Sequence, residues 1–237
     1  MNYNNEQNKI LKLIAQCQKD FEHNLRNKKV MFIYENKDRS VEKAEMYFPL
    51  SSFYHLTGVK VQRKDNKQIL NSYSFYKALE KGRLNTNQYN FIKKDSTTDL
   101  KLSVLPQLMR IDKMAKIIGE FTGYNIVLQT QKLAGNTNAC MGFILNDNLG
   151  AYIPNTALKK DIRTITYLNS KIIAVLKKEH LDNLYKNIVY LKKEYDINFI
   201  LKNEEIKKNI DFSNIFSLDL KIDKKIYEYL QKKEVGK

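Results

Sequence analysis

The sequence predicts an α+β protein with N-terminal helices and a hairpin, a roughly four-stranded antiparallel sheet and a C-terminal helical extension. Two observations carry this prediction. Apolar residues recur every three or four positions towards both ends of the chain, which is typical of amphipathic helices. The middle of the chain instead holds short β-rich runs broken by Gly and Asn, which is typical of an antiparallel meander. Because the two patterns occupy separate regions, we expect segregated helices and sheet.

The N-terminal region begins with a helical pattern. Apolar side chains at positions 10, 13, 14, 17, 21 and 25 predict an amphipathic helix over residues 5–26. The runs VMFIY (30–34) and EMYF (45–48) are apolar and aromatic, and a polar stretch separates them. They predict a β-hairpin.

Two short helices and one leucine-rich helix are expected next. In SSFYHLTG (51–58), Ser51 or Ser52 offers an N-cap and Gly58 offers a C-cap. The segment SYSFYKALEKG (72–82) likewise begins with a serine and ends with a glycine, and predicts a second short helix. Pro106 lies inside the leucine-rich segment 100–109, and predicts either a kink or a helix that starts near Leu105.

Four apolar runs predict the antiparallel sheet, and their residues are 115–123, 125–131, 137–145 and 170–178. Residues 180–196 have one apolar face and predict an amphipathic helix, followed by a helical extension without evident chemistry. We therefore expect a domain over residues 1–178 and a helical extension over residues 179–237.

The charge balance indicates a polyanionic partner. Lys and Arg number 41 against 26 Asp and Glu, which gives a formal net charge of +15 and a pI near 9.5. Such a surface attracts nucleic acids. No apolar run is long enough to span a bilayer and no signal peptide is evident, so we expect a cytoplasmic protein without a membrane partner.

Cofactor and metal chemistry find no support in the motifs. Cys17 and Cys140 have no CxxC spacing, which argues against a zinc site and fits a reducing compartment. The chain contains no GxxxxGK[ST], GxGxxG, HExxH or GxSxG motif. We expect no cofactor.

His55 is the most informative of the three histidines. It stands between aromatic residues and a glycine in FYHLTG, whereas His23 and His180 lie in polar surroundings. From the residues alone, His55 is either a hydrogen-bonded structural histidine or a poised imidazole. Lys101, between leucines in DLKLSVLPQL, is able to project into a cleft.

The stretch IPNTALKKDIRTI (153–165) predicts a short helix capped by Asn155 or Thr156. On that helix, Thr156, Lys160 and Arg163 follow the spacing i, i+4, i+7 and share one face. A helix N-terminus with such neighbours favours bound phosphate. The alternative is that Thr156 only caps the helix and the cations are solvated.

Six segments taken in order resemble a known family: FPLSSFYHLTG, NSYSFYKALEKGRL, DLKLSVLPQLM, TNACMGFIL, YIPNTALKKDIR and KIIAVLKK. The chain resembles subtype four of the phage- and mobile-element-associated Barnase–EndoU–colicin–RelE-like (BECR) nucleases over residues 28–178, and HLTG is the most specific element. The resemblance implies a compact BECR-like domain with RNA bound across a four-stranded sheet. It further implies a metal-independent RNA endonuclease, a toxin in conflicts among bacteria, phages and plasmids, which uses the ribose 2′-OH and leaves a 2′,3′-cyclic phosphate.

The resemblance also assigns roles to residues. It makes His55 the general base or acid, while Lys101 and Arg163 stabilise the transition state and Thr156 hydrogen-bonds a phosphate oxygen. Supporting roles in substrate binding fall to Asn155, Lys160 and either Tyr54 or Tyr73, where each tyrosine is a stacking platform or a core residue. The chain departs from barnase-like and EndoU-like members because no second histidine and no evident glutamate lie in a matched motif.

Two other function classes stay open. One is a non-catalytic basic protein that binds RNA or a ribonucleoprotein such as a host-defence complex. The other is an accessory protein whose C-terminal helices hold a protein partner, such as an antitoxin. The identity of the RNA is not encoded in any motif.

Overall fold

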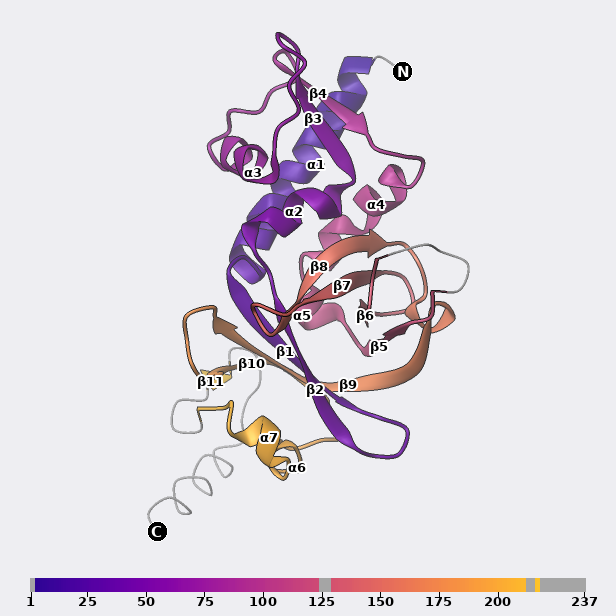
Figure 1. Ribbon diagram of the computed structural model, residues 1–237, viewed down its shortest axis with the longest axis vertical. Helices are drawn as coiled ribbons and strands as arrows, with labels where there is room; N and C mark the ends of the chain where they lie inside the picture. The colour runs from indigo at the N-terminus through magenta and orange to yellow at the C-terminus, as the bar shows by residue number, and fades with distance from the viewer. Residues whose placement is uncertain (1–2, 124–128, 212–215, 218–237) are drawn as a thin grey trace.

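The computed structural model describes residues 3–123, 129–211 and 216–217 (Figure 1). Its centre is a closed, mixed β-barrel of seven strands. The order around the barrel is β1 (Lys28–Glu35), β2 (Val41–Tyr47), β8 (Ala151–Leu158), β7 (Cys140–Asn146), β6 (Lys132–Gly135), β5 (Ile117–Phe121) and β9 (Thr166–Glu179). The barrel closes because β1 pairs with both β2 and β9. Only the β2–β8 contact within it is parallel.

Strand β9 joins the barrel to the C-terminal region. One edge pairs with β1, and the other pairs first with β5 and then with β10 (Asn187–Leu191), which itself meets β11 (Phe216–Ser217). Residues 172–176 of β9 are all buried, because one face packs on the main core and the other on a second apolar cluster. A strand covered on both faces requires the unbroken run IIAVL.

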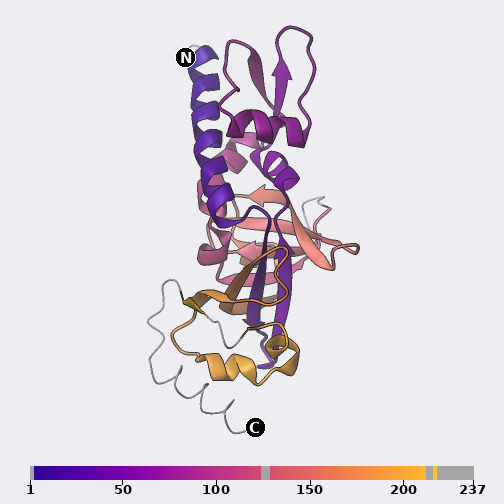
Figure 2. The same cartoon turned by 90° about the vertical axis from the view of Figure 1, so that its left-hand side faces the viewer.

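A helical end covers one mouth of the barrel (Figures 1 and 2). It holds α1 (Tyr3–Asn24), α2 (Leu50–Thr57), α3 (Ser72–Glu80), α4 (Thr98–Leu108) and a separate two-stranded antiparallel sheet of β3 (Val59–Arg63) and β4 (Tyr89–Lys93), which are connected through α3. Helix α5 (Ile111–Met114) follows α4 and packs on β6, β9 and β10. Phe21 of α1 lies with its ring centroid 5.2 Å from that of Phe53 in α2. Both belong to the same buried cluster as barrel residues Phe32 and Phe143, so the helical end and the barrel share one core.

The second cluster lies at the opposite end of the molecule (Figure 2). Helices α6 (Ile197–Leu201) and α7 (Glu204–Lys207) cover it. The buried Tyr185 anchors this region, because its hydroxyl donates a 2.5 Å hydrogen bond to Glu45 of β2. A short 3₁₀ helix, η1 (Ile162–Thr164), packs on a third cluster with β6 and β7.

Much of the N-terminal prediction is confirmed. The first helix, the first hairpin, both short helices and the leucine-rich helix all form, with Pro106 inside α4. The expected cap at Ser51 or Ser52 is wrong, because Pro49 precedes α2 and no side chain caps it. The two-stranded β3–β4 sheet was not predicted.

The predicted sheet is wrong. Strands β5 to β8 do form an antiparallel meander, but β1, β2 and β9 close it into a barrel, so it is not a four-stranded sheet. The expected strand at 125–131 falls largely outside the described residues, and residues 129–131 form no strand.

Two predicted helices are also wrong. Residues 153–165 form most of β8 and then η1, because the β7 edge pairs with them from Ala151 onwards. Residues 180–196 form turns and β10 instead of a helix, because the free edge of β9 beyond β5 captures them. The C-terminal region is therefore not the helical extension that the periodicity predicted. Among the described residues, no helix combines the length and apolar character that a membrane crossing requires.

Candidate functional site

Gly58 organises the segment HLTG at the end of α2. Its φ of +69° ends the helix in the left-handed region, which glycine adopts without steric cost. Its carbonyl oxygen accepts hydrogen bonds from the backbone N–H of Lys94 (3.1 Å) and from the hydroxyl of Thr98 (2.8 Å). A Cβ at this position would lie 2.9 Å from Cδ of Lys101. Gly58 therefore brings α2, the end of β4 and the start of α4 together.

His55 is the exposed residue of this segment. Leu56 and Thr57, which follow His55 directly, are fully buried, and this fixes the backbone that carries the imidazole. Partial desolvation, with a smaller contribution from the Lys94 ammonium, holds the pKa of His55 below its usual value of 6.5. The imidazole is therefore neutral at pH 7, the form that accepts a proton.

Three lysines surround the exposed face of this turn. Burial lowers the pKa of Lys94, and the ammonium groups of Lys101 and Lys60 lower it further. Lys60 in β3 and Lys94 just after β4 are exposed on the solvent side of the β3–β4 sheet, whereas Val59 and Val61 take the core side. The one carboxylate that acts on Lys94 is Asp95, which hydrogen-bonds Thr97. The cluster of His55, Lys60, Lys94 and Lys101, here the basic cluster, is thus a place of excess positive charge, which favours an anion.

The structure places two of the predicted catalytic residues, His55 and Lys101, together around Gly58. Thr156 is buried in β8, in register with Gly142 of β7. Asn155 beside it accepts a 3.1 Å hydrogen bond from Thr130 and donates one to the carbonyl of Gln129. Neither residue caps a helix, so the phosphate site expected at a helix N-terminus there does not exist.

Arg163 and Lys160 lie on other elements than the basic cluster. Arg163 belongs to η1, whose contacts are with β5, β6 and β9, and its guanidinium pairs with Asp161 at 2.6 Å. Lys160 is exposed between β8 and η1. Their predicted substrate contacts stay predictions.

The two candidate stacking tyrosines differ in burial. Tyr54 is a core residue, since its ring stacks on Phe75 at 4.3 Å and its hydroxyl accepts a 2.7 Å hydrogen bond from Val61 N–H. Tyr73 in α3 is 65% exposed. Of the two, only Tyr73 presents a ring face to solvent.

The sequence comparison agrees with the motifs around this site. Residues 13–194 match the family described as phage-Barnase-EndoU-ColicinE5/D-RelE like nuclease 4, which is well over half of the chain. The chain belongs to this family. It matches no curated protein and no solved structure. The match confirms the family and subtype that the motifs indicated and extends beyond residue 178 into β10.

Lys60 and Lys94 of this nuclease were missed by the sequence reasoning. Each lies close in sequence to a recognised feature. Lys60 is the second residue after HLTG, and Lys94 lies four residues before Thr98, where α4 begins. The sequence did not indicate that β3 pairs with β4, and only this pairing brings Lys94 next to Gly58.

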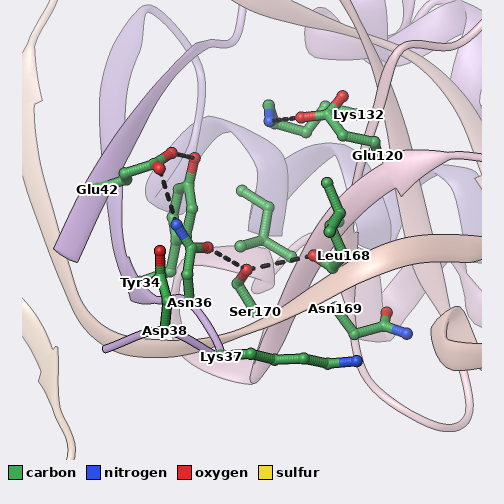
Figure 3. Close-up of a pocket in the computed structure, with 12 residues that line it drawn as sticks. Tyr34, Asn36, Lys37, Asp38, Glu42, Glu120, Lys132, Leu168, Asn169 and Ser170 are labelled. Atoms are coloured by element: carbon green, nitrogen blue, oxygen red, sulfur yellow. Dashed lines mark hydrogen bonds and ion pairs between the residues drawn. The ribbon is translucent and has the colours of Figure 1, made fainter. Parts of the chain in front are cut away.

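A separate hollow of about 380 Å³ opens beside the β1–β2 hairpin (Figure 3). Glu42 accepts hydrogen bonds from the Tyr34 hydroxyl (3.1 Å) and the Asn36 amide (2.7 Å) on one side. Lys132 forms an ion pair with Glu120 on the other. The close-up shows these pairs satisfied within the wall of the hollow.

The charge of this hollow disfavours binding of a phosphate group there. Its wall carries three carboxylates and two ammonium groups, on Asp38, Glu42, Glu120, Lys37 and Lys132. The formal charge of the wall is therefore negative in a protein whose net charge is +15. Such a wall disfavours an anion, whereas the basic cluster carries an excess of positive charge. Within the described ranges, no three His, Cys, Asp or Glu side chains are grouped to hold a metal ion.

Proposed function

We propose that the chain is a metal-independent RNA endonuclease that cleaves through the ribose 2′-OH, with His55 as its general base. One observation carries the proposal: a solvent-accessible imidazole of lowered pKa stands among three lysines at the HLTG turn of a nuclease-family member. This arrangement combines a proton acceptor with a phosphate site.

The proposed reaction conserves protons within the basic cluster. Neutral His55 takes the proton of the 2′-OH, and the 2′-oxygen forms a bond to phosphorus. The bond from phosphorus to the 5′-oxygen breaks, which leaves a 2′,3′-cyclic phosphate. Lys94, whose pKa is lowered by burial and by its two neighbours, donates a proton to the leaving 5′-oxygen. Exchange with water then restores both groups.

The lysines supply the charge stabilisation in this scheme. Lys101 and Lys60 bind the non-bridging phosphate oxygens and stabilise the additional negative charge of the transition state. The attacking group belongs to the substrate, so a strand without a 2′-OH is not cleaved. The proposal therefore includes selectivity for RNA over DNA.

The decisive experiment compares wild type with His55→Ala on RNA in the presence of EDTA, with analysis of the product ends. We expect cyclic-phosphate ends from wild type and a rate lower by about 10²- to 10⁴-fold in the variant, the usual contribution of a general base. His23→Ala is the matched control, because His23 is an exposed histidine on α1. Cleavage by His55→Ala at the wild-type rate would refute the role of His55.

The same experiment tests the competing function. If neither protein cleaves RNA but both bind it in a salt-dependent way, the basic cluster serves an RNA-binding protein that is not a nuclease.

A further inference from the structure

A groove of about 410 Å³ lies between α3 and the β3–β4 sheet, on the helical end of the molecule. Tyr73, Lys77 and Lys81 follow one another at four-residue spacing, so they share the face of α3 that borders the groove. Arg63 and Tyr89, which are paired across the β3–β4 sheet, form the opposite side. The groove is therefore built from two regular elements.

The wall of this groove is basic and amphipathic. It carries four cations and no carboxylate. Arg63 pairs with Asp65 and Lys77 with Glu80, both outside the wall, whereas Lys81 and Arg83 form no ion pair with any described residue. Beside these cations, Tyr73 is 65% exposed and Ile69 is 47% exposed. Exposed apolar surface of this kind on α3 is not required by the core, which takes Phe75, Tyr76 and Leu79 from the other face.

We propose that this groove binds a single-stranded segment of RNA, with one base stacked on Tyr73 and the flanking phosphates on Lys81 and Arg83. Charge complementarity selects a polyanion. The exposed ring selects an unpaired base, since the bases of a duplex are already stacked on one another. The inference rests on the proposed function only for the choice of RNA as the strand.

The groove and the basic cluster are held in fixed relation. Phe75 of α3 stacks on Tyr54 of α2 at 4.3 Å, and the Lys94 ammonium lies 5.7 Å from the centroid of the Tyr54 ring. One buried pair of rings thus separates the two places. The elements that form the groove, α3, β3 and β4, lie at the same end of the molecule as α2, the helix that carries His55 (Figure 1).

The test measures binding separately from cleavage, on a His55→Ala background. Fluorescence anisotropy follows a labelled single-stranded RNA oligonucleotide and the same sequence in a blunt duplex. Tyr73→Ala should weaken single-strand binding by about 5- to 150-fold, the range measured for loss of one stacked base, and change duplex binding little. Tyr167→Ala is the matched control, because Tyr167 is 52% exposed on β9 and lies outside this groove.

A second pair of variants tests the cations. Lys81→Glu with Arg83→Glu should reduce the salt slope of single-strand binding by about 1.4, since each phosphate contact contributes about 0.7. Lys207→Glu with Lys208→Glu changes the net charge equally on α7, at the far end of the molecule, and should leave the slope unchanged.

The outcomes separate the groove from the proposed function. If Tyr73→Ala binds like Tyr167→Ala, or if both charge-reversal pairs give the same slope, the groove is not the binding site. That result leaves His55-dependent cleavage untouched. If the groove variants behave as expected but the protein with His55 intact cleaves no RNA, the groove stands and the nuclease mechanism falls.

Discussion

Gly58 shows how one residue sets the geometry of the candidate site. Its left-handed backbone ends α2, its carbonyl receives both Lys94 and Thr98, and its missing side chain leaves room for Lys101. The sequence alone indicated the C-cap, because a glycine after a short apolar helix is a common stop signal. It could not indicate the two hydrogen bonds, since their donors come from residues 94 and 98.

Replacement of Gly58 by alanine should damage both stability and activity. A left-handed alanine costs about 1–2 kcal/mol, and the new Cβ additionally displaces the Lys101 side chain. Gly82→Ala is the matched control, because Gly82 has a φ of +63° but nothing lies within 4 Å of a Cβ there. Urea unfolding should show the larger loss for Gly58→Ala, and only that variant should lose RNA cleavage. Equal losses of stability and retained activity would contradict the role of Gly58.

The pKa of His55 gives a second prediction at this scale. A neighbouring cation disfavours the protonated imidazole, so Lys94→Gln should raise the pKa of His55. In wild type, cleavage should fall on the acid side only below pH 6.5, where the imidazole takes up its proton.

An NMR titration of the imidazole protons measures this shift without requiring activity. His55→Ala identifies the resonance among the three histidines, and Lys207→Gln serves as the control for loss of a distant lysine. A pKa of His55 that is the same in Lys94→Gln and in Lys207→Gln would show that Lys94 does not act on the imidazole.

At the scale of elements, the sequence predicted those helices whose formation depends on local patterns. α1, α2 and α3 each carry their own periodicity and stop signals, so the sequence indicates them. Residues 153–165 and 180–196 carry helix-like spacing too, but the edges of the strands that precede them, β7 and β9, recruit them into β8 and β10. Pairing with these strands overrides the helical spacing within each segment.

A buried ion pair joins three elements and provides a test of their packing. Lys177 of β9 donates a 2.6 Å hydrogen bond to the fully buried Asp112 of α5 and a 3.2 Å bond to the carbonyl of Asn24 in α1. Lys177→Met leaves the carboxylate of Asp112 without its ion-pair partner, so it should lower the free energy of unfolding by about 3–5 kcal/mol. Asp112→Leu added to Lys177→Met should recover most of this loss in urea unfolding. A single variant as stable as wild type would mean that this ion pair does not hold the three elements together.

At the scale of the whole molecule, closure of the barrel could not be predicted from the sequence. Closure depends on β1 meeting β9 and on β2 meeting β8 at a single parallel register position, Met46 with Tyr152. These contacts join residues more than a hundred positions apart. The charge of the molecule was predictable, because it follows from composition, but not its separation into a basic helical end and a hollow with a negative wall.

The contribution of the C-terminal region is a prediction about the whole fold. A chain that ends at Glu179 loses Tyr185, Ile188 and the α6–α7 cover, and exposes the apolar side chains of β1 and β9 that face them. Large apolar side chains lose about 1.5–3 kcal/mol each on exposure, and a domain has only about 5–15 kcal/mol in total.

We therefore expect the chain that ends at Glu179 to lose several kcal/mol and much of its cooperative thermal transition. A chain that ends at Asp211 keeps β10, α6 and α7 and should melt at a higher temperature than the chain that ends at Glu179. The comparison also tests the predicted boundary after residue 178. If the chain that ends at Glu179 melts as cooperatively as the full chain and still cleaves RNA, residues 1–178 are an independent domain and the remaining residues serve another purpose, such as binding a protein partner.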